Sequence, residues 1–146
     1  MIDYRKKTIT KGQQQLRCGY TTGTCAAAAA KAAAVALLTG EICRDVAICL
    51  PGGENILLET ETLEHQKNCV KCGVIKDAGD DPDITNGLMI CAAVEKNTSG
   101  EICIDGGEGV GRVTQPGLDQ PVGAAAINSV PRKMIQEAVE SVCRQY

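Results

Sequence analysis

Residues 16–40 read LRCGYTTGTCAAAAAKAAAVALLTG, and this stretch decides the fold. Ala is the strongest helix former, so the Ala-rich part predicts a helix over about residues 24–39. Thr22 or Thr24 is a good N-cap, and Gly40 suits the C-cap. Because such a helix carries almost no bulk, neighbouring elements can approach its backbone closely.

Strand-like segments follow this helix. Residues 44–50 and 55–60 are rich in β-formers and flank Pro51-Gly52-Gly53, which predicts a hairpin. Residues 1–15 are predicted to be a polar leader with room for one short strand. Further elements are expected as strands at residues 70–76, 88–95 and 101–105 and as a helix at about 130–144, with Pro131 in its first turn.

These elements predict a single α+β domain over residues 1–146, with a mostly antiparallel or mixed β-sheet on which both helices pack. A chain of 146 residues is long enough for one domain with a real core. The regular strand–helix alternation of a doubly wound fold is absent.

The net charge and the aromatic content both argue against a nucleic-acid partner. The net charge of -3 argues against a broad basic face for DNA or RNA. The sequence has no Trp and no Phe, and its three Tyr residues are too few for a platform that stacks bases. We therefore expect no nucleic-acid partner, although local cationic pockets are compatible with 15 Lys and Arg residues.

The apolar segments are short and interrupted. The N-terminus is polar and shows no signal peptide. The longest apolar run, residues 25–38, contains Lys31 and is too short and too Ala-rich for a membrane span. We expect no membrane partner and a cytoplasmic location. Lys31 itself is most simply read as a side chain that reaches water from a buried helix.

Nine cysteines are present, an odd number at irregular spacing. Without an export signal, this pattern does not predict a disulfide framework. Cys69 and Cys72 form one tight pair, but no second pair or histidine cluster completes a zinc site. We expect no metal site and interpret the cysteines as small buried hydrophobic residues.

Four segments are candidates for chemistry, and the first is the Thr/Gly turn before the Ala-rich helix. Free N–H groups and the positive dipole end at a helix start suit a carboxylate or phosphate. The hydroxyls of Thr21, Thr22 and Thr24 add donors, and Arg17 adds a full charge. An ordinary capped helix explains the same residues. The P-loop pattern is not met.

The second segment is the loop over residues 76–87, KDAGDDPDITNG. It places the carboxylates of Asp77, Asp80, Asp81 and Asp83 within seven residues. Such a loop suits a hard cation, or a general base, because like charges raise one another's pKa. A solvated loop is the alternative.

The third segment, residues 106–112, reads GGEGVGR and follows a predicted strand. Its spacing fails the dinucleotide-binding pattern, and the residues after it look extended, so we reject a Rossmann fold. The glycines let a ligand approach the backbone beside Glu108 and Arg112, although a plain multi-glycine turn is equally compatible.

The fourth segment, residues 126–133, reads AINSVPRK. Arg132 and Lys133 stand at the start of the predicted second helix, which is the unfavourable end for a cation. Such a cation tends to need an anionic partner, either in the protein or in a ligand.

Taken together, LRCGYTTGTCAAAAAKAA, VIKDAGDDPDITNG, GGEGVGRVT and AINSVPR resemble the CbiD family, the cobalt-precorrin-5B C1-methyltransferases of anaerobic cobalamin biosynthesis. The motifs occur in the family's order and span about residues 16–135. The resemblance implies methylation of cobalt-precorrin-5B at C1 to give cobalt-precorrin-6A, with S-adenosylmethionine as methyl donor. Cobalt enters only as part of the substrate.

The resemblance also implies roles for individual residues. The substrate ring carries many acetate and propionate groups, so local cations and N–H donors are expected to bind it. A carboxylate is expected to accept a proton or to face the sulfonium. The expected substrate-binding residues are Arg17, Thr21, Thr22, Gly23, Thr24, Lys31, Lys76, Gly107, Gly109, Arg112 and Arg132. The candidate catalytic residues are Asp77, Asp80, Asp81 and Glu108.

The sequence departs from the family pattern in two ways. Family chains continue into a second α/β region, whereas this chain stops at Tyr146, so it resembles the N-terminal domain of a longer two-domain enzyme. The expected macromolecular partner is that C-terminal domain or another copy of the chain. The family usually has Pro after the Asn of the fourth motif, and here Ser129 stands there.

Two other functions fit parts of the sequence. The Thr/Gly loop before an Ala-rich helix is also found in small-molecule kinases, which predicts binding of a phosphate or nucleotide. A non-catalytic assembly fragment is the second alternative, because a face made to meet another domain tends to self-associate when exposed.

Overall fold

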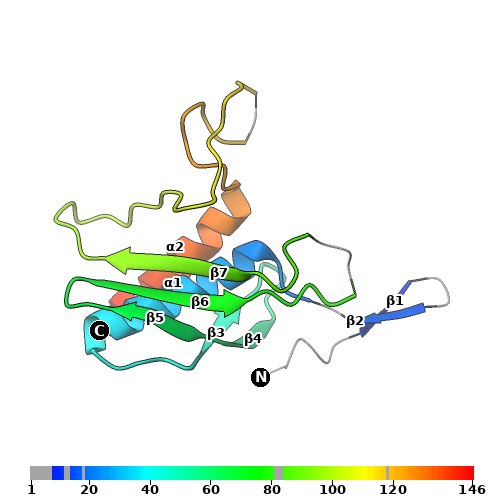
Figure 1. Cartoon of the computed structure of the whole chain (residues 1–146), viewed down its shortest axis with the longest axis horizontal. Coiled ribbons are helices and arrows are strands. Elements are labelled where there is room, and N and C mark those ends of the chain that lie inside the picture. Colours follow the sequence, from blue (N-terminus) through cyan, green and yellow to red (C-terminus); the bar gives the residue numbers. More distant parts are fainter. Residues whose placement is uncertain (1–7, 12–13, 18, 81–83, 118) are drawn as a thin grey trace.

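The computed structural model describes residues 8–11, 14–17, 19–80, 84–117 and 119–146. It contains two helices and seven strands in these ranges, and every strand pair is antiparallel. The predicted α+β class is therefore confirmed (Figure 1). The strands form three separate small sheets, β1-β2, β3-β4 and β5-β6-β7, instead of one.

Helix α1, Thr22–Thr39, is the centre of the molecule. Eleven of its 18 residues are buried, so burial is not confined to one narrow stripe of the helix. Thr21 is the N-cap, and its Oγ1 accepts the N–H of Thr24 at 3.1 Å. The cap predicted at Thr22 or Thr24 was therefore placed too late, because the run of hydroxyl residues offers several candidates. Gly40 ends the helix with φ 77°, as predicted.

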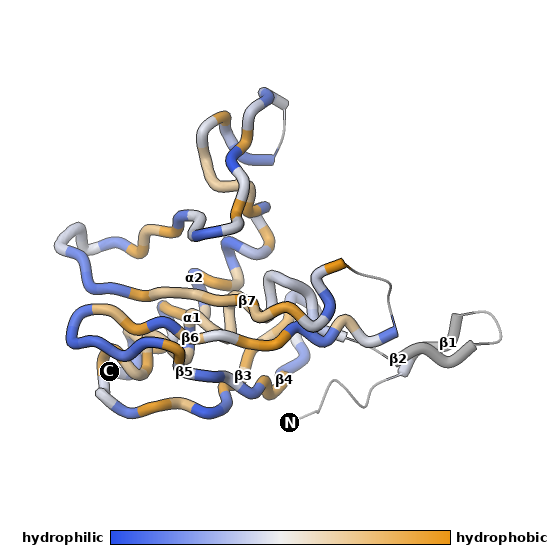
Figure 2. The backbone as a smooth tube through the Cα atoms, viewed as in Figure 1, coloured by the Kyte–Doolittle hydropathy of each residue, from blue (hydrophilic) through white to orange (hydrophobic). Residues whose placement is uncertain are grey.

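The three-stranded sheet covers one side of α1. It consists of β5 (Glu61–His65), β6 (Cys69–Ile75) and β7 (Met89–Glu95). Val70, Cys72 and Val74 of β6 point to the helix and are buried. Hydrophilic residues dominate β5 (Figure 2), and this strand was not predicted.

The hairpin predicted around residues 51–53 is present as β3 (Asp45–Cys49) and β4 (Asn55–Glu59). Its alternating buried residues join the core around α1: Val46, Ile48, Ile56 and Leu58. A second hairpin, β1 (Thr8–Lys11) with β2 (Gln14–Arg17), lies in the leader, where one short strand was expected. It projects from the body of the molecule (Figure 1).

The second helix, α2 (Ser129–Gln145), packs against α1 in parallel. Gly23 meets Pro131 at the start of both helices, while Ala30 and Ala34 pack with Val139 and Val142 farther along. Both helices therefore begin at the same end of the molecule (Figure 1).

The segment between β7 and α2 is irregular, and the strand predicted at residues 101–105 is wrong. Ile102 and Ile104 are half-buried while their neighbours are exposed, so the alternation is real. It reflects one-sided burial of an extended chain without a partner strand. Farther on, the segment around residues 113–124 projects away from the body (Figure 1).

Helix α1 has the length and hydropathy of a membrane-crossing helix, and 61% of it is buried inside the molecule. The core helix of a globular domain passes the same test. We therefore assign α1 to the core on its packing.

Candidate functional site

The first two sequence motifs meet where β6 ends. The N–H of Tyr20 donates to the carbonyl of Asp77 at 2.6 Å. A Cβ on Gly19 would overlap the backbone of Ala78 and Gly79, so only glycine permits this close approach. The Thr/Gly turn and the acidic loop are thus fixed to one another by main-chain contact.

Lys76 joins the acidic loop to the start of α1. Its side chain is buried, with 4% of the residue exposed. Its Nζ donates to Thr22 Oγ1 at 2.9 Å and to Thr85 Oγ1 at 2.6 Å. A buried ammonium needs such partners, and the two hydroxyls hold its charge beside the first turn of the helix.

Cys25 lies buried one turn into α1, below this charge. The pKa of its thiol is raised to about 11, mainly by burial; Lys76 opposes this rise and Asp77 adds to it. The thiol is therefore protonated at neutral pH and serves as core packing. Cys72 is also buried, as predicted, but four cysteines are exposed, contrary to the prediction: Cys49, Cys91, Cys103 and Cys143.

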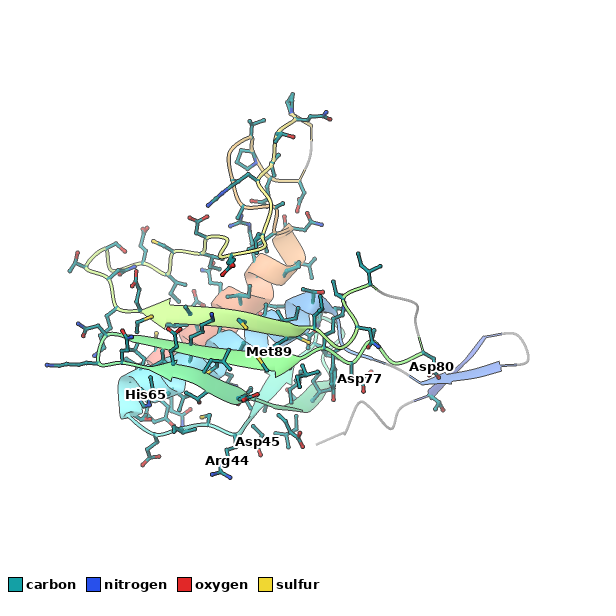
Figure 3. All side chains as sticks on the ribbon, viewed as in Figure 1. Arg44, Asp45, His65, Asp77, Asp80 and Met89 are labelled. Atoms are coloured by element: carbon teal, nitrogen blue, oxygen red, sulfur yellow. The ribbon has the colours of Figure 1, made fainter. Side chains whose placement is uncertain are left out.

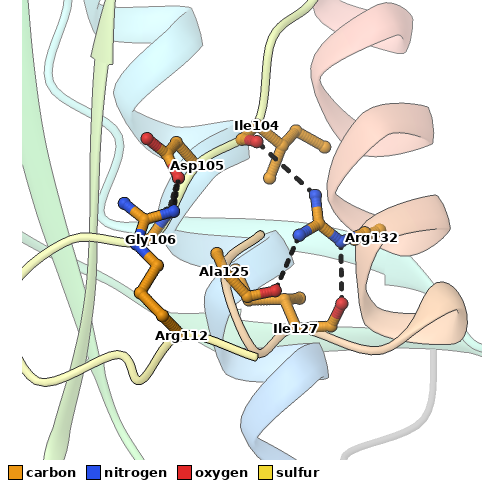
Figure 4. A network of polar contacts seen from close by, with 7 residues as sticks. All are labelled: Ile104, Asp105, Gly106, Arg112, Ala125, Ile127 and Arg132. Atoms are coloured by element: carbon orange, nitrogen blue, oxygen red, sulfur yellow. Dashed lines mark hydrogen bonds and ion pairs between the residues drawn. The ribbon is translucent and has the colours of Figure 1, made fainter. Parts of the chain in front are cut away.

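The third and fourth motifs also meet. Arg112 pairs with Ala125 in an isolated antiparallel bridge, and the N–H of Ala126 donates to Gly111 O at 2.8 Å. The guanidinium of Arg112 forms an ion pair with Asp105 at 2.6 Å (Figure 4). Both side chains are largely exposed.

Arg132 holds this loop to α2 through carbonyl oxygens (Figure 4). Its Nε donates to Ile127 O at 2.7 Å, and a terminal nitrogen donates to Ala125 O at 2.9 Å. A third, longer bond of 3.5 Å reaches Ile104 O. The anionic partner expected for this cation is therefore replaced by backbone carbonyls, and the geometry favours a structural role.

The start of α2 is capped by Asp119, a residue of the preceding loop. Asp119 accepts the N–H of Ser129 at 2.6 Å and its hydroxyl at 2.8 Å, while the preceding Asn128 makes no side-chain cap. These bonds hold the pKa of Asp119 below its usual value of 3.8. Ser129, in the position where proline was expected, supplies both donors, and proline has neither.

The contact between Gly23 and Pro131 brings all four motifs to one end of the molecule. A Cβ on Gly23 would lie 3.0 Å from Pro131 Cβ. The two helix starts are therefore neighbours, and their positive dipole ends lie at the same end of the molecule. Lys76 contacts the first turn of α1, and Arg132 lies in the first turn of α2. Thr21 and Thr22 are exposed there, whereas Gly23 and Thr24 are buried.

The remaining predicted residues are more scattered. Lys31 donates to Ala47 O at 2.7 Å, more than two turns along α1, so it braces β3 instead of joining this end. Asp80 is exposed and lies farther from the sheet than Asp77 (Figure 3). Gly107, Glu108 and Gly109 form an exposed turn. The side chain of Arg17, at the end of β2, and all of Asp81 and Cys18 lie outside the described residues.

A cavity of about 430 Å³ lies on the other side of the Lys76–Asp77 segment. The chain turns away from the end of β6 between β4 and β5, so the last residues of β6 do not have β5 as a neighbour. The cavity occupies this gap, which we call the fork. Its lining includes three carboxylates and an apolar set: Glu59, Glu61 and Asp77, and Tyr20, Ile75 and Met89. The sequence motifs pointed only to Asp77. Nothing in the local sequence marks the others, because the fork exists only in the folded chain.

Within the described ranges, no group of three or more His, Cys, Asp or Glu side chains is arranged to hold a metal ion. Asp77 and Asp80, the acidic residues of the 76–87 loop that are described, belong to no such group. Asp77 instead accepts the N–H of Gly79 at 2.9 Å.

Fold and site together define an α+β domain that gathers four loop motifs at the paired starts of two parallel helices. The CbiD family model matches residues 9–146, and the chain belongs to the CbiD family. The family predicted from the motifs is confirmed.

Relatives of this chain carry a common name. It is 51% identical, over 94% of its length, to the cobalt-precorrin-5B C(1)-methyltransferase of Ruminiclostridium cellulolyticum, and 52% identical, over 92%, to that of Geobacillus kaustophilus. In both cases it spans 36% of the relative's length. A crystal structure of cobalamin biosynthesis protein (cbiD) from Archaeoglobus fulgidus matches 94% of the chain and 43% of that structure, with TM-score 0.60 and 31% identity.

Proposed function

We propose that this chain is the substrate-binding part of a cobalt-precorrin-5B C1-methyltransferase, which acts in the cytoplasm in the anaerobic route to cobalamin. The names of relatives at about half identity support the reaction. The chain spans little more than a third of their length, so the rest of such an enzyme supplies the remaining parts of the catalytic unit.

The observation that carries this proposal is the pairing of two helix starts around Lys76. The substrate is a flat cobalt-containing ring whose edge carries acetate and propionate groups. Carboxylates are favoured near helix N-termini and near cations. The exposed hydroxyls of Thr21 and Thr22 offer hydrogen-bonding groups on one side, where the buried ammonium of Lys76, bonded to Thr22, adds positive charge. Arg112, with the exposed turn at Gly107 and Gly109, offers charge and donors on the other side.

The reaction is the transfer of a methyl cation from a sulfonium donor, S-adenosylmethionine, to carbon C1 of the ring. The carbon–sulfur bond breaks as the new carbon–carbon bond forms, and the bonding electrons stay on sulfur as a neutral thioether. The protein's part is alignment of the two reactants and exclusion of water. A proton then leaves the ring, and the candidate acceptors are Asp77, Asp80, Asp81 and Glu108.

Among these carboxylates, the geometry favours Asp77. It is half-buried, and its backbone is fixed by Tyr20, whereas Asp80 and Glu108 are exposed. Because the backbone of Asp77 is already fixed, orienting its carboxylate costs little entropy when the substrate binds. Cobalt enters as part of the substrate.

Titration with two corrinoids tests the binding role. The chain is expected to bind cobyrinic acid, whose side chains are free carboxylates, at least ~10-fold more tightly than cobinamide, whose side chains are mostly amides. The shift of the corrinoid absorption bands reports binding. Arg112→Ala is expected to weaken the binding of cobyrinic acid alone. Lys133→Ala, which removes an exposed cation near the start of α2, is the matched control.

Equal affinity for both corrinoids, or none for either, would contradict the binding role. Calorimetric titration with ATP examines the kinase-like alternative. Light scattering examines the assembly alternative through self-association. Binding of ATP in preference to cobyrinic acid would replace our proposal with nucleotide recognition.

A further inference from the structure

The three-stranded sheet has one face on α1 and a second face that points away from it. Ile90, Ala92 and Val94 of β7 pack on the core around α1. Because successive side chains of a strand point to opposite faces, the residues between them lie on the second face, which we call the open face. In Figure 1 the sheet lies in front of the two helices, so the open face is turned toward the viewer. Its apolar residues are Leu63, Gly73, Ile75, Met89, Cys91 and Ala93.

The apolar residues of the open face form one continuous patch. In the pairing of β6 with β7, Ile75 lies opposite Met89 and Gly73 lies opposite Cys91. Gly73 has no side chain, so Met89 and Leu63 lie over its backbone. Ile75 is 60% exposed, and Cys91 is exposed as well. Charged residues lie at the margins of the patch: Glu61, Glu64, Lys71 and Glu95. An exposed apolar patch with a polar rim marks an interaction site.

The sequences of β6 and β7 are typical of strands that are covered on both faces. β7 reads MICAAVE and β6 reads CVKCGVI, and each has one charged residue in seven. A sheet with one solvated face alternates apolar and polar residues, whereas strands buried on both faces are apolar nearly throughout. Figure 2 shows this apolar character along β7. The sequence of the sheet therefore indicates that its open face is covered in the working protein.

The outer surface of α2 has the opposite character. Lys133 with Glu137 and Glu140 with Arg144 form exposed ion pairs four residues apart. Such pairs are typical of a helix face that lies in water. The buried residues of this helix belong to the two core clusters: Met134, Ala138, Val139 and Val142. An apolar exposed surface is thus a feature of the sheet and not of the helix that ends the chain.

The length of the relatives and the position of Tyr146 indicate what covers the open face. The chain spans 36% of the length of its relatives, so most of a CbiD enzyme lies outside it. β6 ends beside the start of α1, where Lys76 bonds to Thr22, and therefore runs against the direction of α1. α2 runs parallel to α1 and ends near the start of β6 (Figure 1). A further segment joined to Tyr146 begins at the margin of the sheet, with the open face within reach.

We propose that the open face is the docking surface for the rest of a CbiD enzyme, which buries the patch under an apolar surface of its own. This inference rests on the proposed function, in which the chain is one part of a longer catalytic unit. The fork cavity is lined by Ile75 and Met89 and has room for an anchoring side chain of the docked part. Because the patch extends to the residue before Lys76, the docked part borders the helix starts, where the ring is proposed to bind.

Two exposed cysteines of the chain provide the test. Cys91 lies in the patch, and Cys49 lies on β3, outside it. The chain is mixed with the remainder of the Geobacillus kaustophilus enzyme, meaning the part outside the region that this chain matches. Maleimide labelling followed by mass spectrometry of peptides reports each thiol. In the chain alone both cysteines are expected to react. With the remainder bound, Cys91 is expected to react at least ~10-fold more slowly and Cys49 at an unchanged rate.

A charge placed in the patch should prevent docking without unfolding the chain. Ile75 is 60% exposed, so Ile75→Lys is expected to retain the melting temperature. It is expected to weaken binding of the remainder at least ~10-fold in calorimetry and to restore the reactivity of Cys91. Leu57→Lys, at a 42% exposed position of β4 outside the patch, is the matched control and should bind normally. Equal affinity of the two variants, or a complex in which Cys91 stays reactive, would overturn the proposal.

A fusion keeps the test valid if the remainder does not fold by itself. In the fusion, this chain replaces the matched region of the Geobacillus kaustophilus enzyme, and full reactivity of Cys91 in the folded protein would overturn the proposal. Protection of Cys91 in the chain alone that increases with concentration would assign the face to a second copy instead. Docking without cobyrinic acid binding would keep the docking surface and remove the substrate-binding role. Cobyrinic acid binding without docking would overturn this inference alone.

Discussion

Lys76 Nζ lies 2.9 Å from Thr22 Oγ1, across 54 residues of sequence, and this bond joins the acidic loop to the first turn of α1. Loss of the lysine removes both a donor and buried methylene groups. We expect Lys76→Ala to lower the free energy of unfolding by about 2–3 kcal/mol. Lys76→Met keeps most of the packing volume and should recover about half of that loss in urea unfolding. Equal stability of both variants would contradict this account.

Gly19 should tolerate no side chain. Its Cβ would overlap the backbone of Ala78 and Gly79, which cannot move as a flexible side chain can. We expect Gly19→Ala to cost roughly 2–4 kcal/mol. Faster hydrogen exchange at the amide of Tyr20 would show that its bond to Asp77 is lost. Gly52→Ala has open space around its Cβ and should leave the stability unchanged.

A larger residue at Gly23 should separate the two helix starts. A Cβ there is already 3.0 Å from Pro131 Cβ, and further atoms need more room. We expect Gly23→Val to destabilise the chain by about 1–3 kcal/mol and to weaken the binding of cobyrinic acid. The melting temperature and the cobyrinic acid titration measure these effects. A stable variant with unchanged corrinoid affinity would separate the helix contact from the substrate site.

The role of Arg132 can be separated from its charge. Its three bonds to carbonyl oxygens need the planar fork of a guanidinium, which an ammonium does not provide. We expect Arg132→Lys to cost about 1–3 kcal/mol in thermal unfolding although the net charge is unchanged. Lys133→Arg, on the exposed neighbour, is the matched control. Full stability in Arg132→Lys would indicate that charge alone is required.

The loss of stability as the pH falls should depend partly on Asp119. Its pKa is lowered by Ser129, so the folded state favours the ionised carboxylate. The resulting stabilisation is complete above its ordinary value of 3.8 and is lost as the pH falls through the lower folded value. Asp119→Asn should therefore lose stability relative to the parent above that value, and the difference should shrink in acid.

Urea unfolding at a series of pH values measures this dependence. Ser129→Ala keeps the amide and removes the hydroxyl, so it is expected to show part of the same effect. A constant difference between the parent and Asp119→Asn at every pH would contradict the assignment of Asp119 as the cap.

Much of the fold could be predicted from local composition. The Ala-rich run defined α1 to within two residues at its start, and the residues around Pro51 defined a hairpin. Strand β5 was missed because its sequence, ETLEH, is polar and four of its five residues are exposed, so it shows no alternation of buried and exposed positions. The strand wrongly placed at residues 101–105 shows the reverse error, because alternation reports burial of one face and not a pairing partner.

Only part of the candidate site could be predicted from the sequence. Glycine and threonine motifs identified the helix starts, because close backbone approach requires those residue types. The fork cavity was not foreseen, since Glu59 and Glu61 lie in ordinary strands and meet Asp77 only through the turn of the chain at Thr60. The helix position of Arg132 predicted only that it needs a partner in the protein or in a ligand, and the structure supplies backbone carbonyls as partners.

The small residues between the two helices limit how the distance between the helix axes can change. Gly23, Ala30 and Ala34 lie at the contact with α2, and few natural side chains are smaller. Nearly every substitution there lengthens the distance between the helix axes, and almost none shortens it. Divergence of this surface can therefore widen the gap at the helix starts more readily than narrow it, so variants should drift toward a more open end of the helix pair.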